Sequence, residues 1–155
     1  MEDRVNRGCE IYAEMREAFV EKTPEPMKVL GKAQKGRFLA CFVKSAQPDY
    51  KGTIWGGRAF IMEAKHSENR LEFERISGEQ RTALDTHRFM GAAAYVLMEF
   101  EGRDGGAFLV PWNETRKLME KGQSCTAKDV GRWRVRSEPG EILFLDKPSG
   151  EKVDW

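Results

Sequence analysis

Apolar residues near the N-terminus recur at the spacing of an amphipathic helix, which we predict over residues 3–21. The apolar stripe of this helix consists of Ile11, Met15, Ala18 and Phe19. The helix is expected to end at Thr23-Pro24-Glu25-Pro26, because proline and the residue before it resist helical geometry.

Extended segments are predicted next, because short apolar runs alternate with turn residues. The predicted strands are Met27–Leu30, Phe38–Val43 (a strand or a short helix), Asp49–Trp55 and Arg58–Lys65. Residues 31–37, between the first two strands, are rich in Lys, Arg and Gly, which predicts a basic turn or projecting arm. The Gly56-Gly57 pair between the last two strands predicts a β-hairpin.

The second half of the chain continues to alternate between helical and extended patterns. The predicted elements are a helix over Ser77–Met90, strands at Ala92–Phe100 and Ala107–Val110, a helix from Pro111 to Glu120, a short helix near Thr126–Val130 and a strand at Ile142–Leu145. This order predicts an α/β fold with a mixed β-sheet flanked by helices. Since the 155 residues contain no repeat or linker, a single domain over residues 1–155 is expected.

Composition narrows the class of protein. Charged residues make up 33% and hydrophobic residues 40%, which is the balance of a soluble globular protein. No run approaches the roughly 18 apolar residues of a membrane span, and the N-terminus lacks the apolar core of a signal peptide. Cys9, Cys41 and Cys125 are widely spaced, so neither a disulfide nor a zinc framework is predicted. We expect a cytoplasmic location, in a bacterial cell or a phage-infected host.

Charge is distributed unevenly, although the net charge is only +1. Between residues 26 and 58 the chain has seven Lys or Arg residues and one acidic residue, Asp49. Such a local surplus of positive charge is typical of a surface that contacts phosphates. A solvated basic hairpin is the alternative interpretation.

The candidate chemistry lies in Asp49 and in the segment Glu63-Ala64-Lys65. Because side chains alternate along a strand, Glu63 and Lys65 share one face, and Asp49 can converge on Glu63 from the partner strand. Two adjacent carboxylates repel each other unless a cation joins them, and hard oxygen ligands favour Mg²⁺ or Mn²⁺. A metal held there would activate water for phosphodiester hydrolysis, and Lys65 would stabilise the developing negative charge. A surface ion pair between Glu63 and Lys65 is the alternative.

The pattern of Asp49 followed by Glu63-Ala64-Lys65 resembles the PD-(D/E)xK nuclease signature, and the wider chain resembles the RecU-type Holliday-junction resolvases of that superfamily. The other motifs that carry the resemblance are Asn6-Arg7-Gly8, Pro24-Glu25-Pro26, Asp49-Tyr50-Lys51-Gly52, Gly57-Arg58 and a helix bearing Gln80. The resemblance implies a restriction-endonuclease-like core. It also implies that Asp49 and Glu63 bind the metal, that Lys65 stabilises the transition state and that Gln80 is a further ligand or positions water.

Two features depart from the family pattern. Gln47 stands where the family has a threonine that contacts the metal. The segment between Pro26 and Asp49 is short for the family, which suggests a compact, phage-encoded variant.

Several candidate residues have an alternative, structural interpretation. Ser77 and Gln80 fit a helix capping box, whereas the helical face that Gln80 shares with Leu84 and His87 favours a role at the sheet. Both His66 and His87 are interpreted as structural. Either Glu10 or Glu14 would complete the metal site, as a helical glutamate often does in this superfamily, or both belong to a solvated acidic face.

The expected function is that of a structure-selective endodeoxyribonuclease that resolves four-way (Holliday) DNA junctions by Mg²⁺-dependent hydrolysis, with Mn²⁺ as a substitute. The alternatives are another PD-(D/E)xK endonuclease, of restriction or repair type, and a non-catalytic DNA-binding recombination accessory protein. A homodimer is expected, because paired cuts on two strands require two sites related by a two-fold axis. Branched DNA is the expected partner, a recombinase or branch-migration motor a further one, and no membrane is expected. The expected DNA contacts are Arg7, Lys32, Lys35, Arg37, Lys51 and Arg58.

Overall fold

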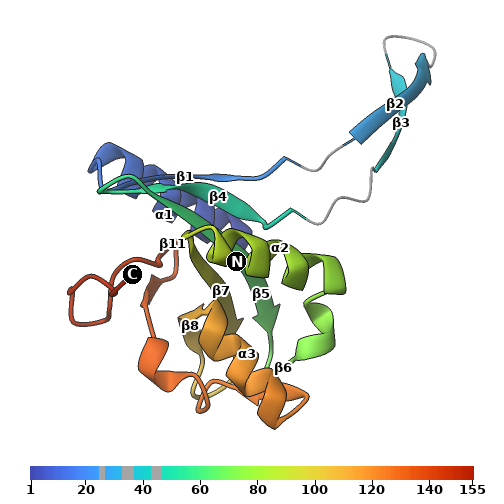
Figure 1. Ribbon diagram of the computed structural model, residues 1–155. Coiled ribbons are helices and arrows are strands. Elements are labelled where there is room, and N and C mark those ends of the chain that lie inside the picture. Colours follow the sequence, from blue (N-terminus) through green and yellow to red (C-terminus); the bar gives the residue numbers. More distant parts are fainter. Residues whose placement is uncertain (25–26, 33–36, 43–46) are drawn as a thin grey trace.

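The computed structural model describes residues 1–24, 27–32, 37–42 and 47–155 (Figure 1). Its helices are α1 (Glu2–Glu14), α2 (Gly78–Phe89) and α3 (Trp112–Lys121), with short 3-10 helices η1 (Phe73–Arg75) and η2 (Gly131–Trp133). Its strands are β1 (Ala18–Lys22), β2 (Met27–Lys32), β3 (Phe38–Phe42), β4 (Tyr50–Ile54), β5 (Arg58–Ser67), β6 (Arg70–Glu72), β7 (Ala93–Phe100), β8 (Gly106–Pro111), β9 (Ser124–Thr126), β10 (Arg136–Glu138) and β11 (Glu141–Leu143).

Five of these strands form the central sheet, in the order β1-β4-β5-β7-β8. The sheet is mixed, because β5 and β7 run parallel whereas the other neighbours are antiparallel. Figure 1 shows α1 behind the sheet and α2 and α3 in front of it. This arrangement confirms the expected α/β fold with a mixed sheet flanked by helices.

A separate apolar core lies on each face of the sheet. The core on the α1 side includes Val5, Tyr12, Tyr50, Phe60 and Met62. The core on the α2 side includes Ile61, Leu84, Val96 and Trp112. Strand β5 is therefore covered on both faces, and alternate residues of this strand enter different cores.

The N-terminal helix is shorter than predicted, because it ends at Glu14 and residues 18–22 form strand β1. Arg16 has a φ of 58°, a left-handed conformation that reverses the chain and is incompatible with a continuing helix. Ala18 and Val20 are buried while Phe19 between them is exposed, which is the alternation of a strand. Of the predicted apolar stripe, only Ile11 lies in the helix and packs against the core, and the helix buries Val5, Cys9 and Tyr12 beside it.

The predicted hairpin around Gly56-Gly57 is confirmed as β4–β5. Three residues, Trp55, Gly56 and Gly57, connect the paired Ile54 and Arg58. Gly56 and Gly57 have φ values of 92° and 84°, positive angles that glycine adopts without steric cost. In this hairpin Tyr50 lies opposite Met62. That register fixes which residues meet at the open end of the hairpin.

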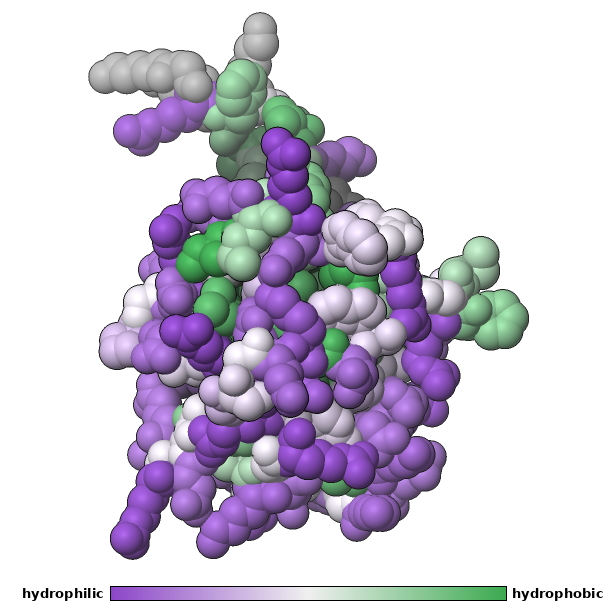
Figure 2. Space-filling view, turned by 90° about the vertical axis from the view of Figure 1, so that its left-hand side faces the viewer, coloured by the Kyte–Doolittle hydropathy of each residue, from purple (hydrophilic) through white to green (hydrophobic). Residues whose placement is uncertain are grey.

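The predicted basic arm begins within a second hairpin, formed by β2 and β3, which stands away from the body of the molecule (Figure 1). Gly31 and Lys32 are part of strand β2, and residues 38–42 form a strand and not a helix. Apolar side chains are exposed on this hairpin, namely Met27, Val29, Leu30, Phe38 and Leu39. Green apolar groups accordingly gather on the projecting part at the top of Figure 2. Lys35, Lys44 and Val43 lie outside the described residues.

The predicted elements from Ser77 to Glu120 are confirmed as α2, β7, β8 and α3. The short helix predicted near Thr126–Val130 is wrong. Thr126 ends strand β9, and a turn follows in which the Asp129 carboxylate accepts hydrogen bonds from the backbone and hydroxyl of Thr126. The strand predicted at Ile142–Leu145 is present in part, because β11 ends at Leu143 and residues 144–145 form a turn. Among the described residues, no helix is long and apolar enough to cross a membrane.

Candidate active site

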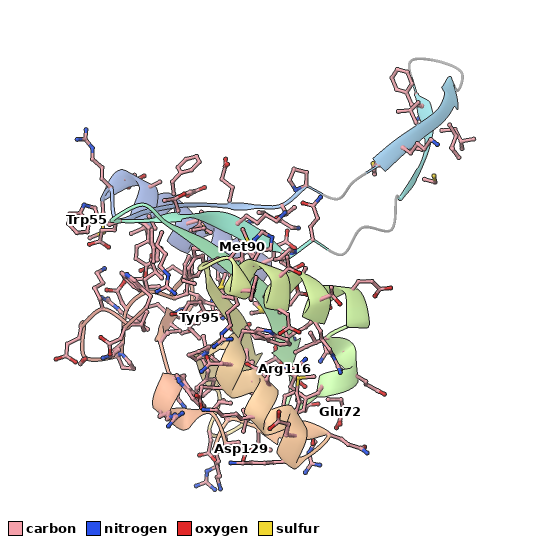
Figure 3. The ribbon with its side chains drawn as sticks, in the orientation of Figure 1. Trp55, Glu72, Met90, Tyr95, Arg116 and Asp129 are labelled. Atoms are coloured by element: carbon pink, nitrogen blue, oxygen red, sulfur yellow. The ribbon has the colours of Figure 1, made fainter. Side chains whose placement is uncertain are left out.

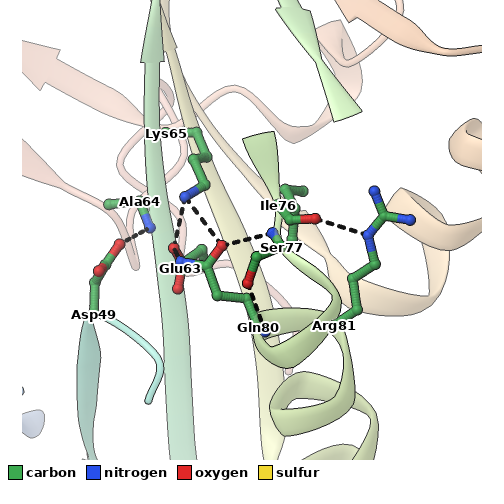
Figure 4. A network of polar contacts seen from close by, with 8 residues as sticks. All are labelled: Asp49, Glu63, Ala64, Lys65, Ile76, Ser77, Gln80 and Arg81. Carbon is green, nitrogen blue, oxygen red and sulfur yellow. Dashed lines mark hydrogen bonds and ion pairs between the residues drawn. The ribbon is translucent and has the colours of Figure 1, made fainter. Parts of the chain in front are cut away.

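Strand pairing brings Asp49 opposite Glu63. Tyr50 pairs with Met62 across the β4–β5 hairpin, so the residue that precedes β4, Asp49, lies level with Glu63 of β5. The Asp49 carboxylate accepts a hydrogen bond of 2.9 Å from the backbone N–H of Ala64. Figure 4 shows Asp49, Glu63 and Lys65 at this end of the hairpin. The structure therefore places together the three residues that the nuclease signature indicated.

Glu63 is a buried carboxylate, with only 1% of its surface exposed. Its Oε1 atom accepts a hydrogen bond of 2.8 Å from Lys65 Nζ and another from Gln80 Nε2. Its Oε2 atom is also buried but has no hydrogen-bond partner among the described residues. An unpaired buried carboxylate oxygen is costly, so this atom marks a position at which an external partner would be favourable.

The surroundings of Glu63 favour its protonated form when no cation is bound. Burial is the main cause and the nearby charge of Asp49 the second, and together they raise the pKa of Glu63 to about 7 from its ordinary 4.5. The closeness of the Asp49 carboxyl group, with which Glu63 could share a proton, acts in the same direction. Lys65 opposes them without cancelling them. The two carboxylates thus lie close enough to compete for a proton or to share a cation.

Gln80 serves the helix and the site at once, so the two interpretations of this residue are compatible. Its Oε1 atom accepts from the backbone N–H of Ser77 at 2.9 Å and from Lys65 Nζ at 3.4 Å. Because Oε1 faces these donors, the Nε2 group faces Glu63 and donates to it. The Ser77 hydroxyl completes the capping box by accepting from the backbone N–H of Gln80 at 3.2 Å. The capping box therefore fixes which end of the amide meets Glu63.

Arg81 holds the backbone that leads into this capping box, a role for which the sequence contains no signal. Its Nε donates to the carbonyl of Ile76 and its Nη2 to the carbonyl of Phe73, both at 2.8 Å. These bonds fix the segment between η1 and α2, as Figure 4 shows for Ile76. The position of Ser77, and through it of Gln80, depends on that segment.

The donor set at Asp49 and Glu63 suits a hard divalent cation, because it consists of carboxylate oxygens and one of them is unpartnered among the described residues. The structure does not bring either Glu10 or Glu14 to this pair. Both glutamates are exposed, and in the described part of the chain no three His, Cys, Asp or Glu side chains gather closely enough to bind a metal. The physical reason is that α1 covers the opposite face of the sheet from Glu63.

The expected DNA-contacting residues occupy different surfaces. Lys51 lies on the same sheet face as Glu63, two residues from Asp49 along the chain, and donates to Gln47 Oε1 at 2.7 Å. Arg58 is exposed and donates to the carbonyl of Gly91, whereas Arg7 on α1 pairs with Glu10. Arg37 is exposed beside β3. The side chain of Lys32 and the whole of Lys35 lie outside the described part of the chain.

The surroundings of the remaining polar candidates, His66, Gln47 and His87, fit a structural role. His66 Nε2 lies 3.0 Å from Glu101 Oε1 at the surface, on the opposite side of β5 from Lys65. Gln47 is exposed and turned toward Lys51, so its carbonyl oxygen already accepts a hydrogen bond. His87 is partly buried on α2.

The chain matches a known protein family over most of its length. The family model described as RecU: Recombination protein U matches residues 1–145. A comparison with curated proteins finds no match. Among solved structures, the chain is similar to Hjc of Archaeoglobus fulgidus, described as a Holliday junction resolvase from an archaeal hyperthermophile, with 14% sequence identity and a TM-score of 0.49. That alignment covers 87% of this chain and 92% of Hjc.

Proposed function

The chain belongs to the recombination protein U family, and on that premise we propose that it is a Mg²⁺-dependent endonuclease that cuts four-way DNA junctions by hydrolysis. The family indicated by the sequence motifs is thereby confirmed. The observation that carries the proposal is the buried Glu63 carboxylate, which faces Asp49 and has one oxygen without a partner among the described residues. Mn²⁺ is expected to replace Mg²⁺, because both prefer oxygen ligands.

Asp49 and Glu63 are the proposed metal ligands. When bound, the cation would supply the positive charge that activates a water molecule and offsets charge on the scissile phosphate. Lys65, which is 14% exposed and lies 2.8 Å from Glu63, is placed to stabilise negative charge on that phosphate from the same side. Glu63 and Lys65 already pair in the absence of DNA, so the ammonium group is held in place before the substrate arrives.

Gln80 is proposed to position these two residues and not to bind the metal itself. Its carbonyl oxygen already accepts from Ser77 and Lys65, which leaves the amide nitrogen to hold Glu63. A donor on Oε1 of Glu63 leaves the other oxygen, Oε2, as the free ligand atom. Such support from neighbouring groups commonly sets the affinity of a metal site.

The proposed substrate is a junction, cut by a homodimer. Resolution requires cuts on two strands related by a two-fold axis, and a symmetric dimer presents two sites in that relation. Phosphate contacts are proposed for Lys51 beside the site, for Arg7 and Arg58, and for Lys32, Lys35 and Arg37 of the arm. The sequence contains no recognisable base-reading motif, so we expect recognition of shape and phosphate.

The test is incubation of the protein with a labelled synthetic four-way junction and with a linear duplex of the same sequence, each with Mg²⁺ or with EDTA. We expect symmetric cuts in the junction, with Mg²⁺ only, and little cutting of the duplex. Equal cutting of the linear duplex would indicate a nuclease of restriction or repair type. Junction binding without any cut, with either Mg²⁺ or Mn²⁺, would indicate a non-catalytic accessory protein.

A further inference from the structure

Thr23 lies in line with the two candidate metal ligands across three neighbouring strands. Lys22 of β1 pairs with Tyr50 of β4, and Tyr50 pairs with Met62 of β5. The next row of the sheet is therefore Thr23, Asp49 and Glu63. The backbone confirms that the strands stay together at this row, because Thr23 N–H donates to the carbonyl of Asp49 at 2.7 Å.

The side chains of this row point to the face of the sheet that carries the site. In the preceding row, Tyr50 and Met62 belong to the core beneath α1, and Lys22 pairs with Glu2 of α1. Neighbouring residues of a strand point to opposite faces. The Thr23 hydroxyl is thus expected on the side of Asp49 and Glu63, away from α1.

Within the described residues, two buried side-chain oxygens have no hydrogen-bond partner, and they are Thr23 Oγ1 and Glu63 Oε2. They belong to the two outer members of the row, on either side of Asp49. A buried hydroxyl without a partner costs free energy, and native proteins retain such a group where a water molecule or an ion satisfies it. A cation bound beside Asp49, together with the water molecules that it carries, would supply partners for both atoms.

We propose that the Thr23 hydroxyl is a third oxygen donor of the Asp49–Glu63 cation site, toward the ion or toward a water that the ion carries. The inference rests on the proposed function, because it assumes that Asp49 and Glu63 bind the metal. A neutral hydroxyl adds an oxygen without adding to the repulsion between the two carboxylates. Since threonine is β-branched, its hydroxyl is also held in few orientations.

The experiment compares Thr23→Val, which removes the oxygen at nearly constant volume, with Thr23→Ser, which keeps it. Mn²⁺ and Mg²⁺ binding to the whole chain is measured by calorimetry in the absence of DNA. We expect Thr23→Val to weaken metal binding about tenfold, the lower end of what supporting residues of metal sites contribute, and Thr23→Ser to bind nearly as the wild type does. The melting temperature of the metal-free Thr23→Val protein is expected to rise, because an unpartnered hydroxyl is gone.

Thr53→Val is the matched control, since Thr53 is an exposed threonine of β4 on the same face of the sheet. It should leave metal affinity unchanged. Wild-type metal affinity in Thr23→Val would overturn the inference, as would equal weakening in Thr23→Ser. Should valine disturb folding, Thr23→Ala removes the same oxygen and must show the same loss.

Asp49→Asn separates this inference from the proposal on which it rests. Loss of metal binding in Asp49→Asn together with normal binding in Thr23→Val would reject the role of Thr23 alone. Normal metal binding in Asp49→Asn would reject the cation site, and with it the proposed function.

Discussion

The two hairpins that follow each other along the chain, β2–β3 and β4–β5, differ in what they expose and what they bury. The β4–β5 hairpin lies inside the central sheet and buries a carboxylate, Glu63. The β2–β3 hairpin stands away from the body and exposes apolar side chains such as Phe38 and Leu39. Figure 3 shows the same contrast between the crowded side chains of the body and those of the hairpin at the upper right.

Both hairpins depart from the usual rule of apolar inside and polar outside, in opposite directions, and such departures are more informative than the rule. In β4–β5 the buried polar group is the carboxylate of Glu63, which is contacted by Lys65 of β5 and Gln80 of α2. In β2–β3 the exposed apolar side chains are spread over both strands. We therefore expect changes at Asp49, Glu63 and Lys65 to alter chemistry with little effect on DNA binding, and changes of the basic residues of the arm to do the reverse.

Substitution of the metal ligands should have the strongest effect. Asp49→Asn or Glu63→Gln should abolish junction cleavage while junction affinity stays the same or rises slightly, because a negative charge that repels phosphate is removed. Cleavage and binding are measured on the same labelled four-way junction, with Mg²⁺ for the first and EDTA for the second. A variant that cuts at nearly the wild-type rate would show that the site has been assigned to the wrong residues.

Lys65→Ala should rank second, with a loss of roughly two to three orders of magnitude in the single-turnover rate. One oriented positive charge is removed, while both carboxylates remain. Junction binding in EDTA serves as the control and should change little. If Lys65→Ala cuts normally, the Glu63–Lys65 contact is only an ion pair.

Glu63 should also make the metal-free protein less stable at high pH, and this effect can be measured without DNA. The pKa of Glu63 is raised to about 7 in the folded state from an ordinary 4.5. Folding therefore favours the protonated form of Glu63. The loss of folding stability caused by burying the charged form is absent below about pH 4.5, grows as pH rises and is complete above about pH 7. This loss of folding stability amounts to about 3 kcal/mol.

Urea unfolding in EDTA at about pH 5 and pH 8 tests this expectation with Glu63→Gln. The variant should be more stable than the wild type by up to about 3 kcal/mol at the higher pH, and most of this gain should vanish at the lower pH. Other titrating groups are shared by both proteins and cancel in the difference. The same stability difference at both pH values would show that burial of the Glu63 charge carries no such cost.

Changes in the arm should have the weakest effect. Neutralising Lys32, Lys35 and Arg37 together should weaken junction binding and lower the slope of log affinity against log salt by about 0.9 for each phosphate that the protein no longer neutralises. Titration of the junction and of a linear duplex at two salt concentrations measures both. Selectivity should fall with affinity if the arm enters the junction centre. Unchanged affinity would show that the basic surplus of this segment is incidental.

The sequence predicted the β4–β5 hairpin and the second half of the fold well because strong local signals determine them. The Gly56-Gly57 turn requires positive φ angles, and the strands on either side are apolar enough to be recognised alone. The boundary between α1 and β1 was missed because helical spacing of apolar residues continued past Glu14. The reversal depends on the left-handed conformation of Arg16, which no residue preference indicated.

The site was predictable only in part, for a similar reason. Asp49, Glu63 and Lys65 form a local pattern on one hairpin, so alternation along the strands places them together. Thr23 follows a strand that had been predicted as part of a helix, and only the pairing of β1 with β4 brings it to Asp49. The dual contact of Gln80 likewise depends on how α2 packs on the sheet, which spacing alone does not determine.

Calorimetric titration of the metal-free protein with Mg²⁺ at about pH 8 asks whether Asp49 and Glu63 bind a cation before any DNA is present, on which the proposed chemistry depends. We predict binding to the wild type, and loss of that binding in Asp49→Asn and in Glu63→Gln while both variants remain folded. Equal Mg²⁺ affinity in the wild type and in both variants would contradict the proposed cation site.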